Sequence, residues 1–122
     1  MALKILLIDD DENILETTKE ILEGYGYEVT VATNGEEGYE YLKINSYDVL
    51  ITDDIMPYMS GMELIEQIRE THPDMPVILT SGRVYNYNKS EMHSNVPQIR
   101  FVLEKPFPVQ LLIDSIESCM QK

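Results

Sequence analysis

The sequence is poor in cysteine, in basic residues and in long apolar runs. Its single cysteine, Cys119, lies at helical spacing from Leu112 and Ile116 and has no cationic neighbour that would activate the thiol. We therefore expect a buried or idle thiol. No apolar run is long enough to span a membrane and no cationic, apolar leader opens the chain, so we expect a soluble, cytoplasmic protein.

The charge balance is strongly acidic. Nine Lys and Arg residues stand against 22 Asp and Glu residues, which gives a formal net charge of −13. Such a chain repels nucleic acid and anionic membranes, so we expect direct binding to neither. With 122 residues, of which 43% are hydrophobic, the chain can bury one core, and we expect a single domain over residues 1–122.

Two hydrophobic periods alternate along the chain. Short apolar runs, typical of strands buried on both faces, cover residues 3–8, 27–32, 49–52, 77–80 and 99–103. Apolar residues at helical spacing predict helices over about 14–25, 35–45, 61–70 and 109–120. The segment 83–96 is polar and rich in Asn and Ser, and we expect a short or irregular helix there.

This alternation predicts the fold class. Strands that alternate with helices imply right-handed βαβ crossovers and a parallel sheet covered on both faces. We therefore expect an α/β fold: a doubly wound, five-stranded, flavodoxin-like (βα)5 sandwich with strand order 2-1-3-4-5. In such sheets, function gathers beyond the carboxyl ends of the strands.

Acidic residues follow the first and third predicted strands, which are neighbours in this order. Asp9, Asp10 and Asp53 should converge there, and packed carboxylates repel one another unless a cation neutralises them. A hard ion such as Mg²⁺, which binds carboxylate and carbonyl oxygens, fits this site. Each acid alone also has a simpler interpretation, since Asp10 or Asp11 can cap the first helix.

A hydroxyl and an ammonium group end the other two strands. Thr80 ends the fourth predicted strand, and Lys105 follows the fifth. Together with carboxylates and Mg²⁺ they can spread the charge of a phosphoryl group, which favours phosphoryl transfer to a carboxylate as covalent acceptor. Taken alone, Lys105 can equally be a solvated loop lysine.

Four motifs in this order resemble the bacterial response-regulator receiver domain over essentially the whole chain. They are LLIDDDE, DVLITDDIMP, PVILTSG and EKPF. The family's phosphoacceptor is the Asp four residues before the Pro of a Met-Pro pair, which here is Asp53 before Pro57. The resemblance implies that Mg²⁺ is bound by Asp10 directly, by Asp9 largely through water, by Asp53 and by the backbone carbonyl of Ile55.

The resemblance also implies how the domain works. A sensor histidine kinase or phosphotransfer protein is expected to donate the phosphoryl group, Thr80 to act as the switch hydroxyl and Lys105 to pair with the phosphoryl group. The Lys105–Pro106 peptide is expected to be cis. The domain is then not an enzyme in the usual sense: it promotes its own phosphorylation and switches partner binding, as a monomer or weak dimer. Self-dephosphorylation should be slow, because Ile55 and Gly82 offer no polar side chain to position water.

Three features depart from the family pattern. Asp54 occupies a position that the family commonly fills with an apolar residue, and we expect a loop carboxylate turned away from the site. Val102 stands where an aromatic residue usually precedes the Lys by three, with Phe101 one residue earlier. The irregular segment 83–96 falls where many receivers present their output surface. In addition, IRFVLEKPF followed by PVQLLIDSI resembles receivers attached to hybrid histidine kinases.

Other readings remain open from the sequence. A receiver-like module that binds partners without phosphorylation would share the fold, although the intact acidic, Thr80 and Lys105 set argues against it. A haloacid-dehalogenase phosphatase would account for the Asp-x-Asp spacing in DDDEN, but that family usually has Thr or Val where Asn13 stands. A flavodoxin-like FMN carrier would need hydroxyls and amides, not acids, after the first strand.

Overall fold

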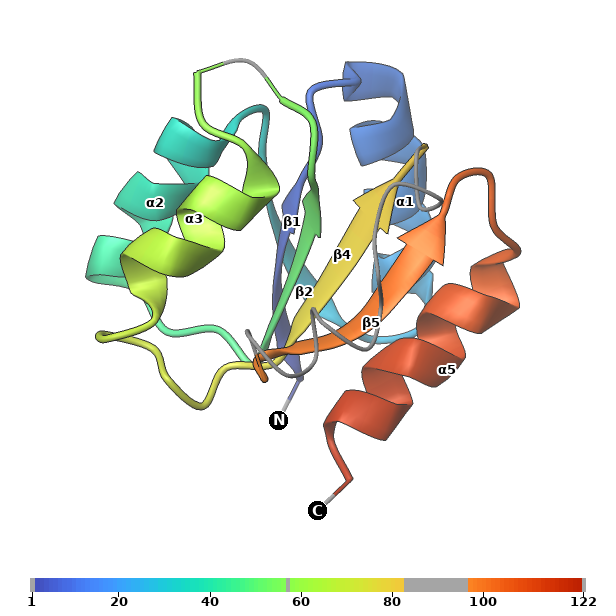
Figure 1. Cartoon of the computed structure of the whole chain (residues 1–122). Helices are drawn as coiled ribbons and strands as arrows, with labels where there is room; N and C mark the ends of the chain where they lie inside the picture. The colour runs from blue at the N-terminus through green and yellow to red at the C-terminus, as the bar shows by residue number, and fades with distance from the viewer. Residues whose placement is uncertain (1, 57, 83–96, 122) are drawn as a thin grey trace.

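The computed structural model describes residues 2–56, 58–82 and 97–121. Their helices and strands, labelled as in Figure 1, are β1 (Lys4–Ile8), α1 (Glu12–Gly24), β2 (Glu28–Ala32), α2 (Gly35–Ile44), β3 (Val49–Asp53), α3 (Gly61–Ile68), β4 (Val77–Ser81), β5 (Ile99–Glu104) and α5 (Val109–Cys119). The helix predicted over 83–96 lies outside the described residues. None of the helices in the described ranges is long and apolar enough to cross a membrane.

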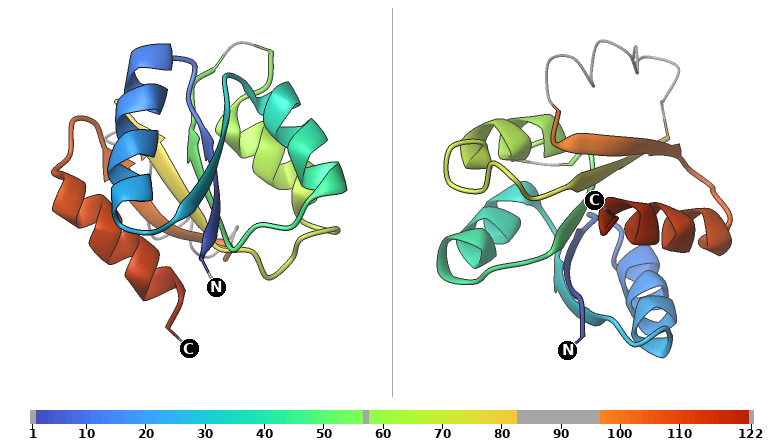
Figure 2. Two further views of the ribbon diagram at one scale, coloured as in Figure 1. Left: turned by 180° about the vertical axis from the view of Figure 1, so that it is seen from behind. Right: turned by 90° about the horizontal axis from the view of Figure 1, so that it is seen from below.

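The five strands form one parallel sheet in the order β2-β1-β3-β4-β5. This confirms the predicted doubly wound α/β fold. Helices α2 and α3 cover one face of the sheet, and α1 and α5 cover the other (Figures 1 and 2). The core is accordingly split into two apolar layers, one built around Leu64 and Ile65 of α3 and the other around Leu22 of α1 and Ile116 of α5.

The burial of the central strands explains why they could be predicted from the sequence. All five residues of β3 and all five of β4 are buried, because helices cover both faces of the sheet. Strands in that setting are nearly continuous apolar runs, and their first polar residues mark where they leave the core. The register places Asp53 directly opposite Thr80 at this end of the sheet.

Helix ends follow local capping. Helix α1 begins after Asp11, whose carboxylate accepts hydrogen bonds from the backbone N–H groups of Asn13 (3.0 Å) and Ile14 (3.3 Å). Of Asp10 and Asp11, the two candidates for the N-cap of this helix, Asp11 is the one that caps it. The helix ends before Gly26, which adopts a left-handed φ of 94° that a residue with a side chain adopts less readily. Helix α3 is shorter than predicted and ends at Ile68.

One irregularity lies in β5 at the edge of the sheet. Val77 pairs with Ile99 but Ile78 pairs with Phe101, so one extra residue, Arg100, interrupts the register. The extra residue inverts the alternation of the strand: Ile99 and Val102 belong to the apolar layer of α2 and α3, whereas Phe101 packs in the layer of α1 and α5. Phe101 therefore cannot replace the aromatic residue that the family usually carries at the position of Val102.

Candidate functional site

Three carboxylates meet at the carboxyl end of the sheet. Asp9 follows β1, Asp10 comes next in the chain, and Asp53 is the last residue of β3. Oxygen atoms of all three lie within 4.8 Å of one another. Asp9 and Asp53 are 4% and 7% exposed, whereas Asp10 is exposed to solvent. The convergence predicted from the strand order is therefore present, and the resulting acidic cluster is exposed to solvent at Asp10.

Lys105 brings a positive charge to this cluster from the loop after β5. Its Nζ atom lies 2.6 Å from Oδ2 of Asp9 and 3.4 Å from Oδ2 of Asp53. Burial lowers the pKa of Lys105, but the hydrogen bond with Asp9 and the attraction of Asp53 outweigh it, so the net pKa is raised and the ammonium form is favoured. The simple reading of Lys105 as a solvated loop lysine does not describe this structure. The Lys105–Pro106 peptide is cis, as the resemblance implied.

Asp53 lies in an environment that disfavours its charge. Burial raises the pKa of Asp53 to about 6; Lys105 opposes this shift and the neighbouring carboxylate of Asp9 adds to it. Asp9 differs from Asp53 in having two donors, since it also accepts the backbone N–H of Asp11 at 2.9 Å. Of the two buried carboxylates, Asp53 is thus the one whose charge is less neutralised by the protein, so a bound cation would favour its charged form.

The raised pKa of Asp53 predicts that the stability of the fold depends on pH. Because the pKa of folded Asp53 lies above the ordinary value of 3.8, the neutral form of this carboxyl favours folding. This contribution to stability is fully present below pH 3.8 and is lost as the pH rises through about 6. Without divalent cations, we expect Asp53→Asn to raise the free energy of unfolding at about pH 7.5 by about 1–2 kcal/mol, allowing for solvent screening. Urea unfolding with a chelator at that pH and at about pH 4, where the gain should nearly vanish, measures this. Equal gains at both pH values would contradict it.

Thr80 reaches the site from β4 with its hydroxyl turned to the neighbouring strand. Its Oγ1 donates to the backbone carbonyl of Thr52 at 3.4 Å, and the residue is 4% exposed. The Thr52 hydroxyl in turn donates to the carbonyl of Asp53 at 2.9 Å. Thr80 is therefore beside Asp53 in the register, but its hydroxyl binds the backbone of β3 and would have to turn to bind a group held on Asp53.

The loop from β3 to α3 is anchored by Asp54. Its carboxylate accepts the N–H of Met62 at 3.3 Å and its carbonyl accepts the N–H of Gly61 at 2.8 Å. As expected, Asp54 is turned away from the acidic cluster, but it is 8% exposed and bound to a helix, not a solvated loop carboxylate. Burial raises the pKa of this carboxyl, and the Met62 N–H opposes the rise. Sequence reasoning missed this role; the only signal was an acid where an apolar residue is usual.

Gly61 shows how tightly this loop packs under the site. A Cβ atom at Gly61 would lie 2.5 Å from the backbone oxygen of Asp53 and 3.1 Å from the Cα of Asp54. Both neighbours are backbone atoms that cannot swing aside, so glycine is required for this approach. The start of α3 thereby rests directly against the backbone of Asp53, a contact that the sequence alone did not reveal.

The donor set suits a hard divalent cation. The side chains of Asp9, Asp10 and Asp53 offer only carboxylate oxygens, and Asp10 is exposed to solvent, so water or a phosphoryl oxygen can approach from its side. Mg²⁺ prefers such oxygen ligands and keeps several waters. The raised pKa of Asp53 fits a site completed by a cation. Ile55, whose carbonyl was expected to be a further ligand, follows Asp53 by two residues, and its side chain is 54% exposed.

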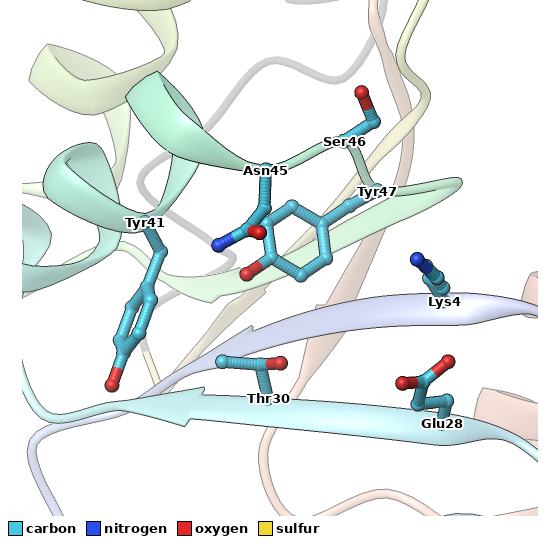
Figure 3. A pocket seen from close by; sticks show the side chains of 7 residues that line it. All are labelled: Lys4, Glu28, Thr30, Tyr41, Asn45, Ser46 and Tyr47. Atoms are coloured by element: carbon cyan, nitrogen blue, oxygen red, sulfur yellow. The ribbon is translucent and has the colours of Figure 1, made fainter.

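A polar pocket lies elsewhere on the molecule, away from the acidic cluster (Figure 3). It lies near the start of β1, beside β2 and the end of α2, whereas the acidic cluster follows the end of β1. Its lining residues are Lys4, Glu28, Thr30, Tyr41, Asn45, Ser46 and Tyr47. The pocket contains none of the residues expected for phosphoryl transfer, which lie at the opposite, carboxyl end of the sheet.

Comparison with known proteins agrees with this geometry. A family model described as the response regulator receiver domain matches residues 5–117. The response regulator receiver protein CpdR of Brucella abortus is 33% identical over 117 residues, which cover 96% of each chain. A 3',5'-cyclic-nucleotide phosphodiesterase, regA of Dictyostelium discoideum, is 32% identical over 122 residues, but the match covers 15% of that protein.

Solved structures give the same picture. A response regulator receiver domain protein from Clostridium thermocellum superimposes with a TM-score of 0.83 at 34% identity, covering 97% of this chain and 94% of that one. The response regulator TrrA from Thermotoga maritima, solved in complex with Mg²⁺-BeF, superimposes with a TM-score of 0.82 at 30% identity, covering 97% of this chain and 99% of that one.

Proposed function

The chain belongs to the response regulator receiver domain family, and from this premise we propose that Asp53 accepts a phosphoryl group with the help of Mg²⁺ and Lys105. Receiver domains are regulatory units of two-component signalling that receive phosphoryl groups from histidine kinases or phosphotransfer proteins. The observation that carries the proposal for this chain is the meeting of Asp9, Asp53 and Lys105: two buried carboxylates share one ammonium group at the carboxyl end of the sheet.

The proposed donor is a phosphohistidine on a sensor histidine kinase or phosphotransfer protein. A carboxylate oxygen of Asp53 forms a bond to phosphorus while the bond from phosphorus to the histidine nitrogen breaks, and the imidazole leaves with the electron pair. Lys105, already 3.4 Å from Asp53, neutralises charge on the phosphoryl oxygens. Mg²⁺, held by Asp9, Asp10, Asp53 and the carbonyl of Ile55, would supply further positive charge to those oxygens.

Thr80 is the proposed switch. Its hydroxyl donates to the carbonyl of Thr52 in this structure, so binding a phosphoryl oxygen on Asp53 exchanges one acceptor for another. The loop after β5 is tied to the same strand, because the N–H of Lys105 donates to the carbonyl of Ser81 at 2.8 Å. A shift of the β4 backbone that accompanies this exchange would also move the Lys105 loop, so phosphorylation can shift the population of two arrangements of this edge.

The experiment that tests the function is intact mass spectrometry after incubation with Mg²⁺ and acetyl phosphate. We expect a mass gain of one phosphoryl group, which is lost in alkali because an acyl phosphate hydrolyses there. A chelator should prevent the gain. An unmodified mass under these conditions and after incubation with histidine kinases would contradict the proposal.

We also expect the phosphorylated state to be long-lived. Ile55 has an apolar, half-exposed side chain beside the site and Gly82 has none, so neither can hold an attacking water. Ile55→Asn adds an amide at this exposed position, and we expect it to shorten the half-life of the acyl phosphate by roughly tenfold, the effect of one hydrogen bond to the attacking water in the transition state. Ile55→Leu is the matched control. Equal half-lives for Ile55→Asn and Ile55→Leu would argue against this reading.

The wider context is also proposed. We propose that residues 1–122 act as one receiver unit in the cytoplasm, as a monomer or weak dimer, and that its charge of −13 keeps it from nucleic acid and membranes. The chain spans 96% of CpdR but 15% of the phosphodiesterase, so its relatives include both short proteins and parts of long ones. Attachment to a hybrid histidine kinase stays a prediction.

A further inference from the structure

Asp54 is a buried carboxylate that needs a physical explanation. It is 8% exposed, and among residues 2–56, 58–82 and 97–121 no Lys or Arg forms an ion pair with it. Burying a carboxylate without a cation costs free energy that an apolar residue at the same position would not cost. A side chain buried at such a cost is a candidate for a role beyond packing.

The contacts of Asp54 join three elements. Its N–H donates to the carbonyl of Thr80 on β4 at 3.0 Å, and its carbonyl accepts the N–H of Gly61 at 2.8 Å. Its carboxylate accepts the N–H of Met62 at 3.3 Å. Amide groups at the start of a helix carry partial positive charge, so they are suitable partners for a buried anion. Asp54 thereby connects the acceptor strand β3 to the switch strand β4 and to α3.

Helix α3 has its own local cap. The hydroxyl of Ser60 accepts the N–H of Glu63 at 3.1 Å, and the carboxylate of Glu63 accepts the N–H of Ser60 at 3.2 Å. This capping box can start the helix without Asp54. What only the Asp54 carboxylate adds is a side-chain bond across the loop, between a residue adjacent to Asp53 and a residue of the helix.

The loop that Asp54 closes contains a strained residue. Tyr58 has a φ of 70°, a left-handed conformation that costs about 1–2 kcal/mol for a residue with a side chain. Such conformations persist where the surrounding structure holds them. The backbone bond from the Asp54 carbonyl to Gly61 and the side-chain bond from the Asp54 carboxylate to Met62 close this loop at its base, and loss of the carboxylate would leave only the first of them.

We propose that Asp54 is a positioning residue whose carboxylate holds the loop from β3 to α3, and with it Asp53 and the carbonyl of Ile55, in the arrangement that binds Mg²⁺ and accepts a phosphoryl group. The proposal rests on the proposed function. It assigns separate roles to two adjacent carboxylates. Asp53 pairs with Lys105 and accepts the phosphoryl group, whereas Asp54 binds the start of α3 and positions Asp53 and the Ile55 carbonyl.

The test compares variants that keep or remove the acceptor oxygen. Asp54→Asn keeps one such oxygen, and Asp54→Leu fills the space without one. The matched control is Asp48→Ala, because Asp48 is an exposed carboxylate just before β3 that also accepts a backbone N–H, that of Lys4 at 2.8 Å. For each protein, calorimetry measures the Mg²⁺ dissociation constant, urea unfolding the stability, and intact mass the rate of phosphorylation by acetyl phosphate across Mg²⁺ concentrations.

We expect Asp54→Leu to raise the Mg²⁺ dissociation constant roughly tenfold, as loss of a residue that orients metal ligands typically does. Its phosphorylation should be slow at low Mg²⁺ and recover as Mg²⁺ rises, while Asp54→Asn and Asp48→Ala stay close to wild type. If Asp54→Leu fails to fold, Asp54→Ala serves in its place, since it removes the oxygen without adding volume.

The possible outcomes distinguish the proposed function from the positioning role of Asp54. A wild-type protein that neither binds Mg²⁺ nor gains a phosphoryl group overturns the proposed function. A wild-type protein that does both, beside an Asp54→Leu variant with unchanged Mg²⁺ affinity and rate, overturns only the positioning role, even if that variant is less stable. An Asp54→Asn variant as impaired as Asp54→Leu also overturns it, because the acceptor oxygen would then not matter.

Discussion

Asp53→Asn is expected to abolish the mass gain of one phosphoryl group on treatment with Mg²⁺ and acetyl phosphate. The amide is not a nucleophile at neutral pH, and no other carboxylate of the site combines the burial of Asp53 with its contact to Lys105 and its position opposite Thr80. Asp9, the other buried carboxylate of the cluster, is engaged by Lys105 at 2.6 Å and by the N–H of Asp11. Intact mass of wild type and variant side by side measures the loss.

The neighbouring residue provides the control for this experiment. Asp54→Asn removes a charge one residue along the chain and keeps an acceptor for the N–H of Met62. We expect it to accept the phosphoryl group as wild type does. Persistent labelling of Asp53→Asn, or its loss in Asp54→Asn alone, would show that the two carboxylates have been assigned the wrong roles.

Lys105→Met is expected to lower the rate of phosphorylation by acetyl phosphate on the order of 10²-fold, the usual effect of removing one group that stabilises transition-state charge. Methionine keeps much of the length of the side chain but removes the ammonium group that lies between Asp9 and Asp53. Since Lys105 lowers the pKa of Asp53, its loss should also raise that pKa further above 6. The initial rate at saturating Mg²⁺ and the carboxyl titration of Asp53 by NMR measure the two effects.

Two other lysine substitutions make the result specific. Lys105→Arg keeps the positive charge with a different shape and should retain more activity than Lys105→Met. Lys43→Met removes a lysine whose ion pair with Glu40 lies on the exposed surface of α2, and we expect no change in rate. A Lys105→Met variant that is phosphorylated as fast as Lys43→Met would remove Lys105 from the mechanism.

The fold could be predicted because its signals are local. β1, β3 and β4 are covered on both faces, so each is an apolar run that stops where the strand leaves the core. Alternation with amphipathic helices then leaves few topologies for a parallel sheet. Ends of helices were less predictable: α3 ends at Ile68, earlier than its apolar spacing suggested.

Details of the site were harder to predict, because they depend on contacts between distant residues. The sequence shows Asp53 and Asp54 as equivalent neighbours, and only the resemblance to a family distinguished them. In the structure, successive residues at the end of β3 have different partners, Lys105 for Asp53 and Met62 for Asp54. The shift at Arg100 was equally hidden, since one extra residue in β5 changes which face Phe101 occupies without changing the composition of the strand.

By itself, the order of apolar runs and polar strand ends determined the layers of this protein and the edge where its chemistry would gather, because burial and strand periodicity act over a few residues; the strand order followed from the fold class that this alternation indicates. Only the tertiary structure decided which acid is paired with Lys105 and which acid binds the start of α3. It also decided that only glycine fits at position 61, where the backbone of Asp53 is too close for a Cβ atom. These outcomes depend on distances between residues far apart in sequence, which packing sets and local pattern does not encode.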